Sequence, residues 1–342
     1  MVRITIIYSL ILFFSFSSLY SQDAELQSAY SKQDDLDPSM KLELQKIGRD
    51  VINFLRWKRL PQAEKKLQEY ESLQSTTDEF FYLRAAIYFT KKQLNLAESD
   101  LKRSLSINSK HEAAYYLIGM VYGIWSDWNR SMEAFKIAVE LSPYNPHYYN
   151  NLAISYYMLG EFELARLAAG KAIEQKANFT EAKILLIQIE RKLNKTESAY
   201  KNAEKLFKDD LKNTEIKFLL AELIFESSKE YQRVIQLLEK ERNLPVSTKR
   251  ILAQSYDYLM QENQSDSLWK DIVESGLATD EDKKKYINLL IKQNKIALAD
   301  RYSLEYINQN SARADEVRSL YESSLRYNFA MEKLYYYFPL SK

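Results

Sequence analysis

The chain has 342 residues, with 48 Lys and Arg against 47 Asp and Glu, only 6 Gly and 6 Pro, and no Cys. The lack of cysteine excludes disulfides, thiolate metal sites and cysteine nucleophiles, and the net charge of +1 gives no bulk basic field to attract nucleic acid or an anionic membrane. Glycine and proline fall far below their usual shares of roughly 7% and 5%, which favours helices over a turn-rich sheet protein.

The first 21 residues differ in kind from the rest of the chain. Arg3 gives a short cationic start, residues 4–20 are almost wholly apolar, and residues 21–23 turn polar. This pattern is typical of a secretory signal peptide. An uncleaved membrane anchor is the alternative, although the apolar run is slightly shorter than the ~20 residues that a spanning helix prefers. We therefore expect an exported protein, and the lack of cysteine favours a bacterial periplasm or cell envelope.

Residues 22–43 are polar and lack a clear period, so we expect a linker there, with helical periodicity beginning near Leu42. Beyond the linker, residue types recur every 34 positions. Large aromatic residues take this step at Phe54, Tyr88, Tyr122 and Tyr156, and small residues take it at Ala63, Ala97, Ser131, Ala165 and Ala199. Each unit holds two apolar stripes of helical spacing separated by a short polar break. Residues 44–213 are therefore predicted to form a row of helical hairpins.

These units resemble the tetratricopeptide repeat, whose pattern is W-x2-L-G-x2-Y, then A-x3-F, then P. The matching residues are Tyr115, Ile118, Gly119 and Tyr122, followed by Ser131, Phe135, Ala138 and Pro143. The resemblance implies an all-α fold, a right-handed superhelical solenoid of helix-turn-helix repeats. It also implies a scaffold that holds protein or peptide partners rather than an enzyme.

The register loosens after residue 213. Val234 occupies the small-residue position 35 residues after Ala199, which indicates one inserted residue. Residues 214–313 are predicted to form degenerate repeats of the same type. A solenoid needs a cap on its last open face, so residues 314–342 are expected to supply a capping helix and an aromatic tail. Docking of a partner or a membrane surface by this tail is the alternative.

The sequence offers no recognisable catalytic pattern. Its two histidines, His111 and His147, lie outside any HExxH motif, and there is no G-x-S-x-G or phosphate-binding glycine loop. We expect both to be ordinary surface histidines. We accordingly expect no catalytic residue, no metal and no cofactor.

Candidate binding residues follow from the resemblance, because in this family the first helix of each repeat lines a concave groove. The repeat register carries that role to Tyr82, Phe89, Tyr116, Met120, Ile124, Asn150, Ile154, Tyr157, Met158, Gln188, Arg191 and Phe218. An aromatic and methionine lining suits an apolar helix or an extended segment of a partner. The competing interpretation is that several of these side chains only pack between adjacent helices, Tyr82, Tyr116, Tyr157 and Met158 above all.

Three functions remain open on this basis. The first is an exported scaffold that binds envelope proteins or peptides through the groove, with no nucleic acid partner and with membrane contact only through an uncleaved N-terminal segment. The second is an assembly or structural factor that self-associates through its aromatic C-terminal end. The third is a cell-envelope enzyme acting on a wall polymer, for which no site is visible.

Overall fold

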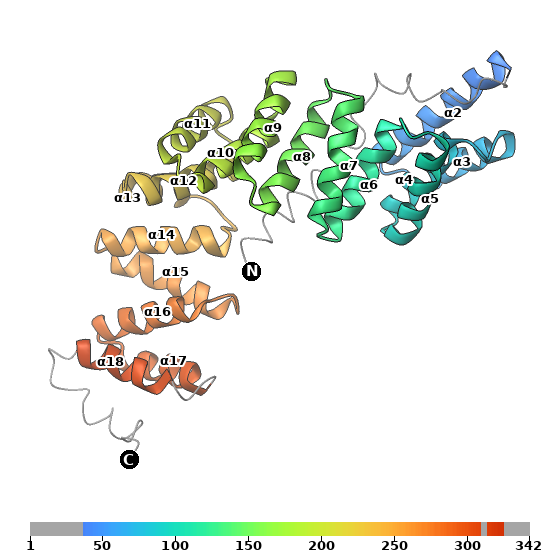
Figure 1. The fold of residues 1–342 in the computed structure, drawn as a ribbon. Helices are drawn as coiled ribbons and strands as arrows, with labels where there is room; N and C mark the ends of the chain where they lie inside the picture. The colour runs from blue at the N-terminus through green and yellow to red at the C-terminus, as the bar shows by residue number, and fades with distance from the viewer. Residues whose placement is uncertain (1–36, 309–312, 325–342) are drawn as a thin grey trace. The chain divides into compact units, whose positions relative to one another are not determined.

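The computed structural model describes residues 37–308 and 313–324, and within them every regular element is an α-helix (Figure 1). Seventeen helices, α2 to α18, follow one another in these residues. The expected signal peptide, most of the expected linker and the aromatic tail lie outside the described residues. None of the helices described is long and apolar enough to span a bilayer.

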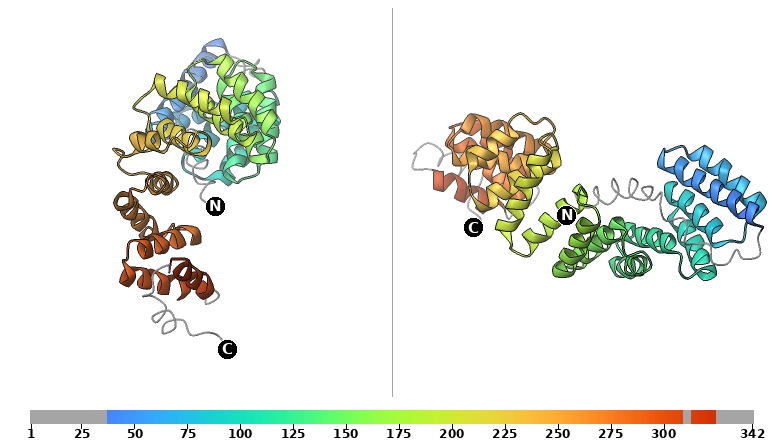
Figure 2. Two further views of the ribbon diagram at one scale, coloured as in Figure 1. Left: turned by 90° about the vertical axis from the view of Figure 1, so that its left-hand side faces the viewer. Right: turned by 90° about the horizontal axis from the view of Figure 1, so that it is seen from above.

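The first compact unit extends to Lys195 and is built from consecutive helical hairpins. Each helix packs against the next one along the chain (Figures 1 and 2). The helices described in this unit are α2 (Pro38–Arg56), α3 (Leu60–Leu73), α4 (Asp78–Thr90), α5 (Leu94–Ile107), α6 (Glu112–Ile124), α7 (Trp128–Leu141), α8 (Pro146–Leu159), α9 (Phe162–Gln175) and α10 (Thr180–Lys192).

The second unit begins at Thr196 and repeats the same local plan. Its described helices are α11 (Thr196–Asp209), α12 (Thr214–Ser227), α13 (Tyr231–Leu238), α14 (Val246–Tyr258), α15 (Glu262–Glu274), α16 (Asp280–Lys292), α17 (Ile296–Asn308) and α18 (Ala314–Ser324). The last helix, α18, packs against α16 and α17, and its Val317 is fully buried. The boundary between the two units falls within the predicted row of hairpins 44–213, whereas the sequence pattern changes at residue 213.

Small residues allow the two helices of each hairpin to approach closely. The predicted small positions are all fully buried, which confirms the register: Ala63, Ala97, Ser131, Ala165 and Ala199. Between α6 and α7 the contact is tight, because a Cβ added at Gly119 would lie 2.8 Å from the ring of Phe135. The hydroxyl of Ser131 also donates a 2.9 Å hydrogen bond to the carbonyl of Gly119. A larger residue at either position would force these helices apart.

Each hairpin from α2–α3 to α10–α11 turns through one residue with a left-handed backbone. These residues are 34 positions apart and have φ between 56° and 82°: Lys58, Lys92, Ser126, Gly160 and Asn194. In the α4–α5 turn, the N–H groups of Lys92 and Gln93 donate back to the carbonyls of Phe89 and Tyr88, both at 2.9 Å. These bonds satisfy carbonyls that the end of the helix would otherwise leave without a donor.

The inserted residue that the sequence indicates lies in the first helix of its hairpin. The next left-handed residue, Lys229, follows Asn194 by 35 positions. The capping position keeps the 34-residue step, since Asn213 follows Phe179 at the start of α12. Helix α12 has 14 residues where α10 has 13, so the extra residue is absorbed as helix.

The predicted C-terminal boundary of the linker, residue 43, is wrong, because residues 38–43 already belong to α2. Asp37 caps this helix, its carboxylate accepting the N–H of Ser39 at 3.2 Å. Pro38 then stands in the first turn, where its fixed φ suits a helix and its missing N–H is not needed. The polar composition of this segment hid a well-capped helix start.

Candidate partner-binding face

The first helices of the hairpins form a continuous layer in the first unit. Helix α2 contacts α4, α4 contacts α6, and α8 contacts α10. Ring contacts join these helices near their beginnings. The ring centroids of Tyr82 and His111 are 4.9 Å apart, those of Tyr116 and Tyr148 are 4.7 Å apart, and those of His147 and Phe179 are 4.9 Å apart. The helices that carry the predicted binding residues of this unit are therefore neighbours.

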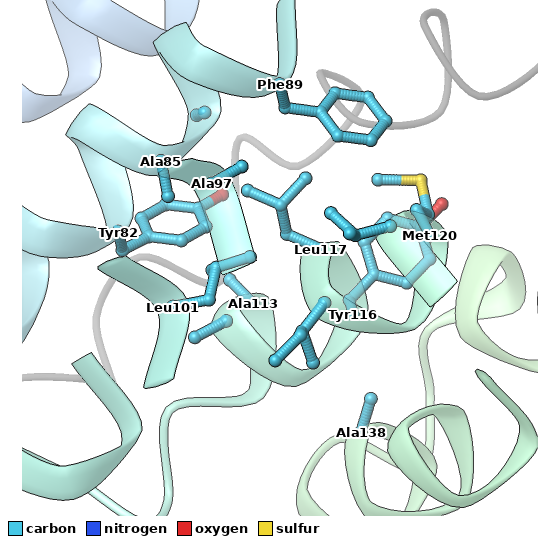
Figure 3. Packing of buried hydrophobic residues seen from close by; sticks show 14 of the residues in the cluster. Tyr82, Ala85, Phe89, Ala97, Leu101, Ala113, Tyr116, Leu117, Met120 and Ala138 are labelled. Atoms are coloured by element: carbon cyan, nitrogen blue, oxygen red, sulfur yellow. The ribbon is translucent and has the colours of Figure 1, made fainter. Parts of the chain in front are cut away.

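Five of the predicted binding residues are buried in the core, with exposed fractions of 7% or less: Tyr82, Phe89, Tyr116, Met120 and Asn150. Figure 3 shows Tyr82, Phe89, Tyr116 and Met120 among other buried hydrophobic residues. Tyr116 lies between the rings of Phe135 and Tyr148, and its hydroxyl accepts a 2.8 Å hydrogen bond from Asn151. Tyr82 and Tyr116 therefore pack between adjacent helices.

The other predicted residues of the first unit are half-buried: Ile124, Ile154, Tyr157, Met158, Gln188 and Arg191. Ile154, Tyr157 and Met158 are spaced at i, i+3 and i+4 and so share one face of α8. The ring of Tyr157 also meets that of Phe162 edge-on, with centroids 5.5 Å apart. Phe218 is half-buried as well, but it lies on α12 in the second unit. Apolar side chains on α6 and α8 are thus partly exposed.

One of the buried predicted residues is polar. Asn150 on α8 is 7% exposed, and no described residue donates a hydrogen bond to its Oδ1. A buried amide oxygen without a donor is costly.

The expectation of surface histidines is wrong for His111, which is 1% exposed. Its Nε2 lies 3.3 Å from Oε2 of Glu79, itself 2% exposed. Two further buried carboxylates, Asp78 and Glu112, stand in the first turns of α4 and α6, where the helix dipole favours negative charge. Burial alone would lower the pKa of His111, but the carboxylate of Glu79 and the charges of Asp78 and Glu112 together raise it above its usual value. The sequence pattern gave no sign of this pair.

His147 is half-buried at the start of α8, against the ring of Phe179. Burial and the nearby ammonium of Lys176 lower the pKa of His147 to about 4. Its imidazole is therefore neutral at neutral pH. The two histidines thus have opposite shifts, and neither is an ordinary surface group.

No group of three or more His, Asp or Glu side chains that could hold a metal ion occurs within residues 37–308 and 313–324. What the face does offer is apolar and aromatic surface on α6 and α8, with polar groups of Gln188 and Arg191 beyond it on α10.

Comparison with known proteins agrees with this architecture. A family model described as a tetratricopeptide repeat matches residues 78–111. The solved structure of the PilF protein of Pseudomonas aeruginosa is similar over 66% of this chain and 99% of its own, with a TM-score of 0.52 and 12% identity. A tetratricopeptide repeat protein from Parabacteroides merdae is similar over 72% of this chain and 98% of its own, also with a TM-score of 0.52 and 12% identity.

Two curated relatives match short stretches of the sequence. The bovine BBSome complex member BBS4 is 31% identical over 78 residues, which is 23% of this chain and 15% of that protein. The mouse protein of the same name is 27% identical over 121 residues, 35% of this chain and 22% of its own length. The chain thus spans less than a quarter of these relatives' lengths. Tandem helical hairpins, the 34-residue register and the matching repeat model lead to one conclusion: the chain is a helical repeat protein of the tetratricopeptide type.

Proposed function

We propose that this protein is an exported, non-catalytic scaffold that binds a protein or peptide partner in the cell envelope through the first-helix face of its first unit. The observation that carries the proposal is the set of half-buried apolar side chains on α6 and α8, Ile124, Ile154 and Met158. They lie on an otherwise closely packed layer. Such a surface suits an apolar helix or extended segment, since anchoring side chains can fill the spaces between neighbouring helices.

The apolar N-terminal segment 4–20 supports export, because its length and flanking residues are typical of a signal peptide. The repeat architecture supports partner binding, since stacked hairpins create extended surfaces. Methionine and isoleucine side chains add adaptable contact area to such a surface.

The test uses the full chain with three substitutions on the first helices, Ile124→Gln, Ile154→Gln and Met158→Gln. Each removes apolar contact area worth about 1 kcal/mol, so we expect recovery of a partner from an envelope extract to fall about tenfold or more. Circular dichroism during thermal unfolding checks that the variant remains folded.

The matched control removes the same number of apolar side chains from second helices. Leu96, Leu164 and Leu167 are 49%, 44% and 58% exposed, on α5 and α9. Their replacement by Gln is expected to leave capture unchanged. Equal losses in both variants, or none in the first, would refute the proposed face. Partners recovered only from a cytoplasmic extract would refute the envelope location.

A further inference from the structure

The hairpin turns at the start of the first unit expose aromatic and basic side chains. The α2–α3 turn carries Trp57, Lys58 and Arg59, and the α4–α5 turn carries Lys91 and Lys92, all of them exposed. Trp57 has an exposed fraction of 58%. The guanidinium of Arg59 lies 5.8 Å from the ring centroid of Trp57. A large apolar side chain and cations thus share one turn.

These turns are neighbours in space. Lys91 in the second turn forms an ion pair with Glu64 on α3, with Nζ and Oε1 2.5 Å apart. Arg130, at the third turn, lies 3.7 Å from the carboxylate of Glu98 on α5. The third turn adds an exposed indole, Trp125, which is 36% exposed. We call the set Trp57, Lys58, Arg59, Lys91, Lys92 and Trp125 the turn edge.

Three cations of the turn edge differ from Lys91 in their surroundings. Lys58, Arg59 and Lys92 form no ion pair with any residue that the structure describes, whereas Lys91 is paired. Buried carboxylates of the same hairpins stand at the opposite ends of the first helices, in the first turns of α4 and α6. The charge is therefore separated along the helices, positive at the turn edge, even though the whole chain is nearly neutral.

The helix dipole explains part of this arrangement but not all of it. Cations near the carboxyl ends of helices are stabilised by the dipole, which accounts for the lysines at the first two turns. It does not account for exposed indoles at two of the turns. Exposed tryptophan beside lysine and arginine is the composition that meets a lipid headgroup layer, where the indole sits at the interface and the cations meet anionic lipid.

We infer that the turn edge docks the protein on an anionic phospholipid surface. Nucleic acid is the less favoured occupant, because its binding needs a larger basic stripe than three unpaired cations. This surface differs from the expectation that membrane contact occurs only through the N-terminal segment. It is also distinct from the first-helix face of the proposed function. Either proposal can therefore be refuted while the other stands.

The experiment is flotation of the full chain with vesicles of phosphatidylcholine, with or without phosphatidylglycerol. The edge variant carries Lys58→Asn, Arg59→Gln and Lys92→Asn, and asparagine suits the left-handed backbone of Lys58 and Lys92. Each cation removed weakens binding about fivefold, so the variant is expected to lose about a hundredfold of its affinity for anionic vesicles. Added salt should weaken the parent chain in the same direction.

The matched control removes three exposed lysines from the second unit, Lys205→Gln, Lys240→Gln and Lys270→Gln. It loses the same charge and keeps the N-terminal segment, so it should bind as the parent does. A second readout is quenching of tryptophan fluorescence by brominated lipid. The Trp57→Phe variant should lose part of that quenching, whereas Trp269 is fully buried and contributes none.

Three results would overturn the inference. The first is equal binding to neutral and anionic vesicles by the parent chain. The second is an equal loss in the edge and control variants. The third is an edge variant that keeps its vesicle binding while losing affinity for a duplex of DNA or RNA.

Discussion

At the scale of single residues, His111 is a fully buried titratable group beside a buried carboxylate. It takes the position before α6 that Thr77 takes before α4 and Asn145 before α8, yet it makes no capping bond. Its imidazole instead lies 3.3 Å from the carboxylate of Glu79. Removing one partner of such a buried pair leaves the other charge uncompensated, which typically costs about 3 kcal/mol or more.

The raised pKa of His111 makes the stability of the first unit depend on pH. A histidine with a raised folded-state pKa binds its proton more tightly in the folded protein. Its contribution is therefore complete below the unfolded value of about 6.5 and is lost as pH rises through the folded value. We predict that the free energy of unfolding, measured by urea titration, declines above pH 6.5 in the parent chain relative to His111→Gln.

Below pH 6.5 the difference in free energy of unfolding between the parent and His111→Gln should be constant, because His111 is charged in both the folded and the unfolded parent. The lowered pKa of His147 acts in both proteins and cancels. The assignment of a charged His111 would be contradicted if the parent's free energy of unfolding, relative to that of His111→Gln, stayed constant from pH 6 to 9 or rose with pH.

Sequence periodicity could predict the small and apolar positions but not this pair. Ala63 and Ala97 follow from the 34-residue step because apolar burial repeats with the helices. Glu79 and His111 lie 32 positions apart and on no apolar stripe, so nothing in the period links them. The same limit applies to Tyr82 and Tyr116, since register placed them on the first helices but not among their buried neighbours.

At the scale of the helical hairpin, the left-handed turn residue sets the link between the two helices. The step of 34 positions is exact from Lys58 to Asn194, although the residue type changes each time. Residues other than glycine pay roughly 1 kcal/mol or more for this backbone. The turn conformation is thus imposed by the packing of the two helices and not by local preference. The positions of glycine in the sequence therefore do not predict where these turns occur.

Two alanine substitutions separate backbone strain from packing. A Cβ at Gly160 or at Gly170 meets no atom within 4 Å, but only Gly160 has a positive φ, of 82°. Gly160→Ala should therefore lower the free energy of unfolding by about 1 kcal/mol. Gly170→Ala, inside α9, should raise it by about 0.5–1 kcal/mol, because alanine is the better helix former.

Chemical denaturation of the two variants and the parent provides the measurement. Equal effects of the same sign would contradict the role of the left-handed turn. A companion change, Met260→Gly, places glycine where a residue 87% exposed adopts φ of 56°, and it should stabilise the chain by about 1 kcal/mol.

At the scale of the whole molecule, the total charge of the chain did not predict where its charged side chains lie. The near-equal numbers of acidic and basic residues predicted no bulk basic field. Lys58, Arg59 and Lys92 nevertheless lie at the turns of the first hairpins without an ion pair to any described residue. Hairpin order and register could be foreseen because each repeat touches only its neighbours along the chain. The division into two compact units after Lys195 could not be foreseen, because the 34-residue pattern continues through that point.

The central claim, that the first helices hold a protein partner, is tested most directly by photo-crosslinking in intact cells. A photoreactive amino acid is placed at Met158 on α8 in one chain and at Leu167 on α9 in another. Both replace a large apolar side chain, and Leu167 is the more exposed of the two. We predict a crosslinked protein from position 158 and none from position 167. Crosslinks of equal yield from both positions, or from position 167 alone, would contradict the account.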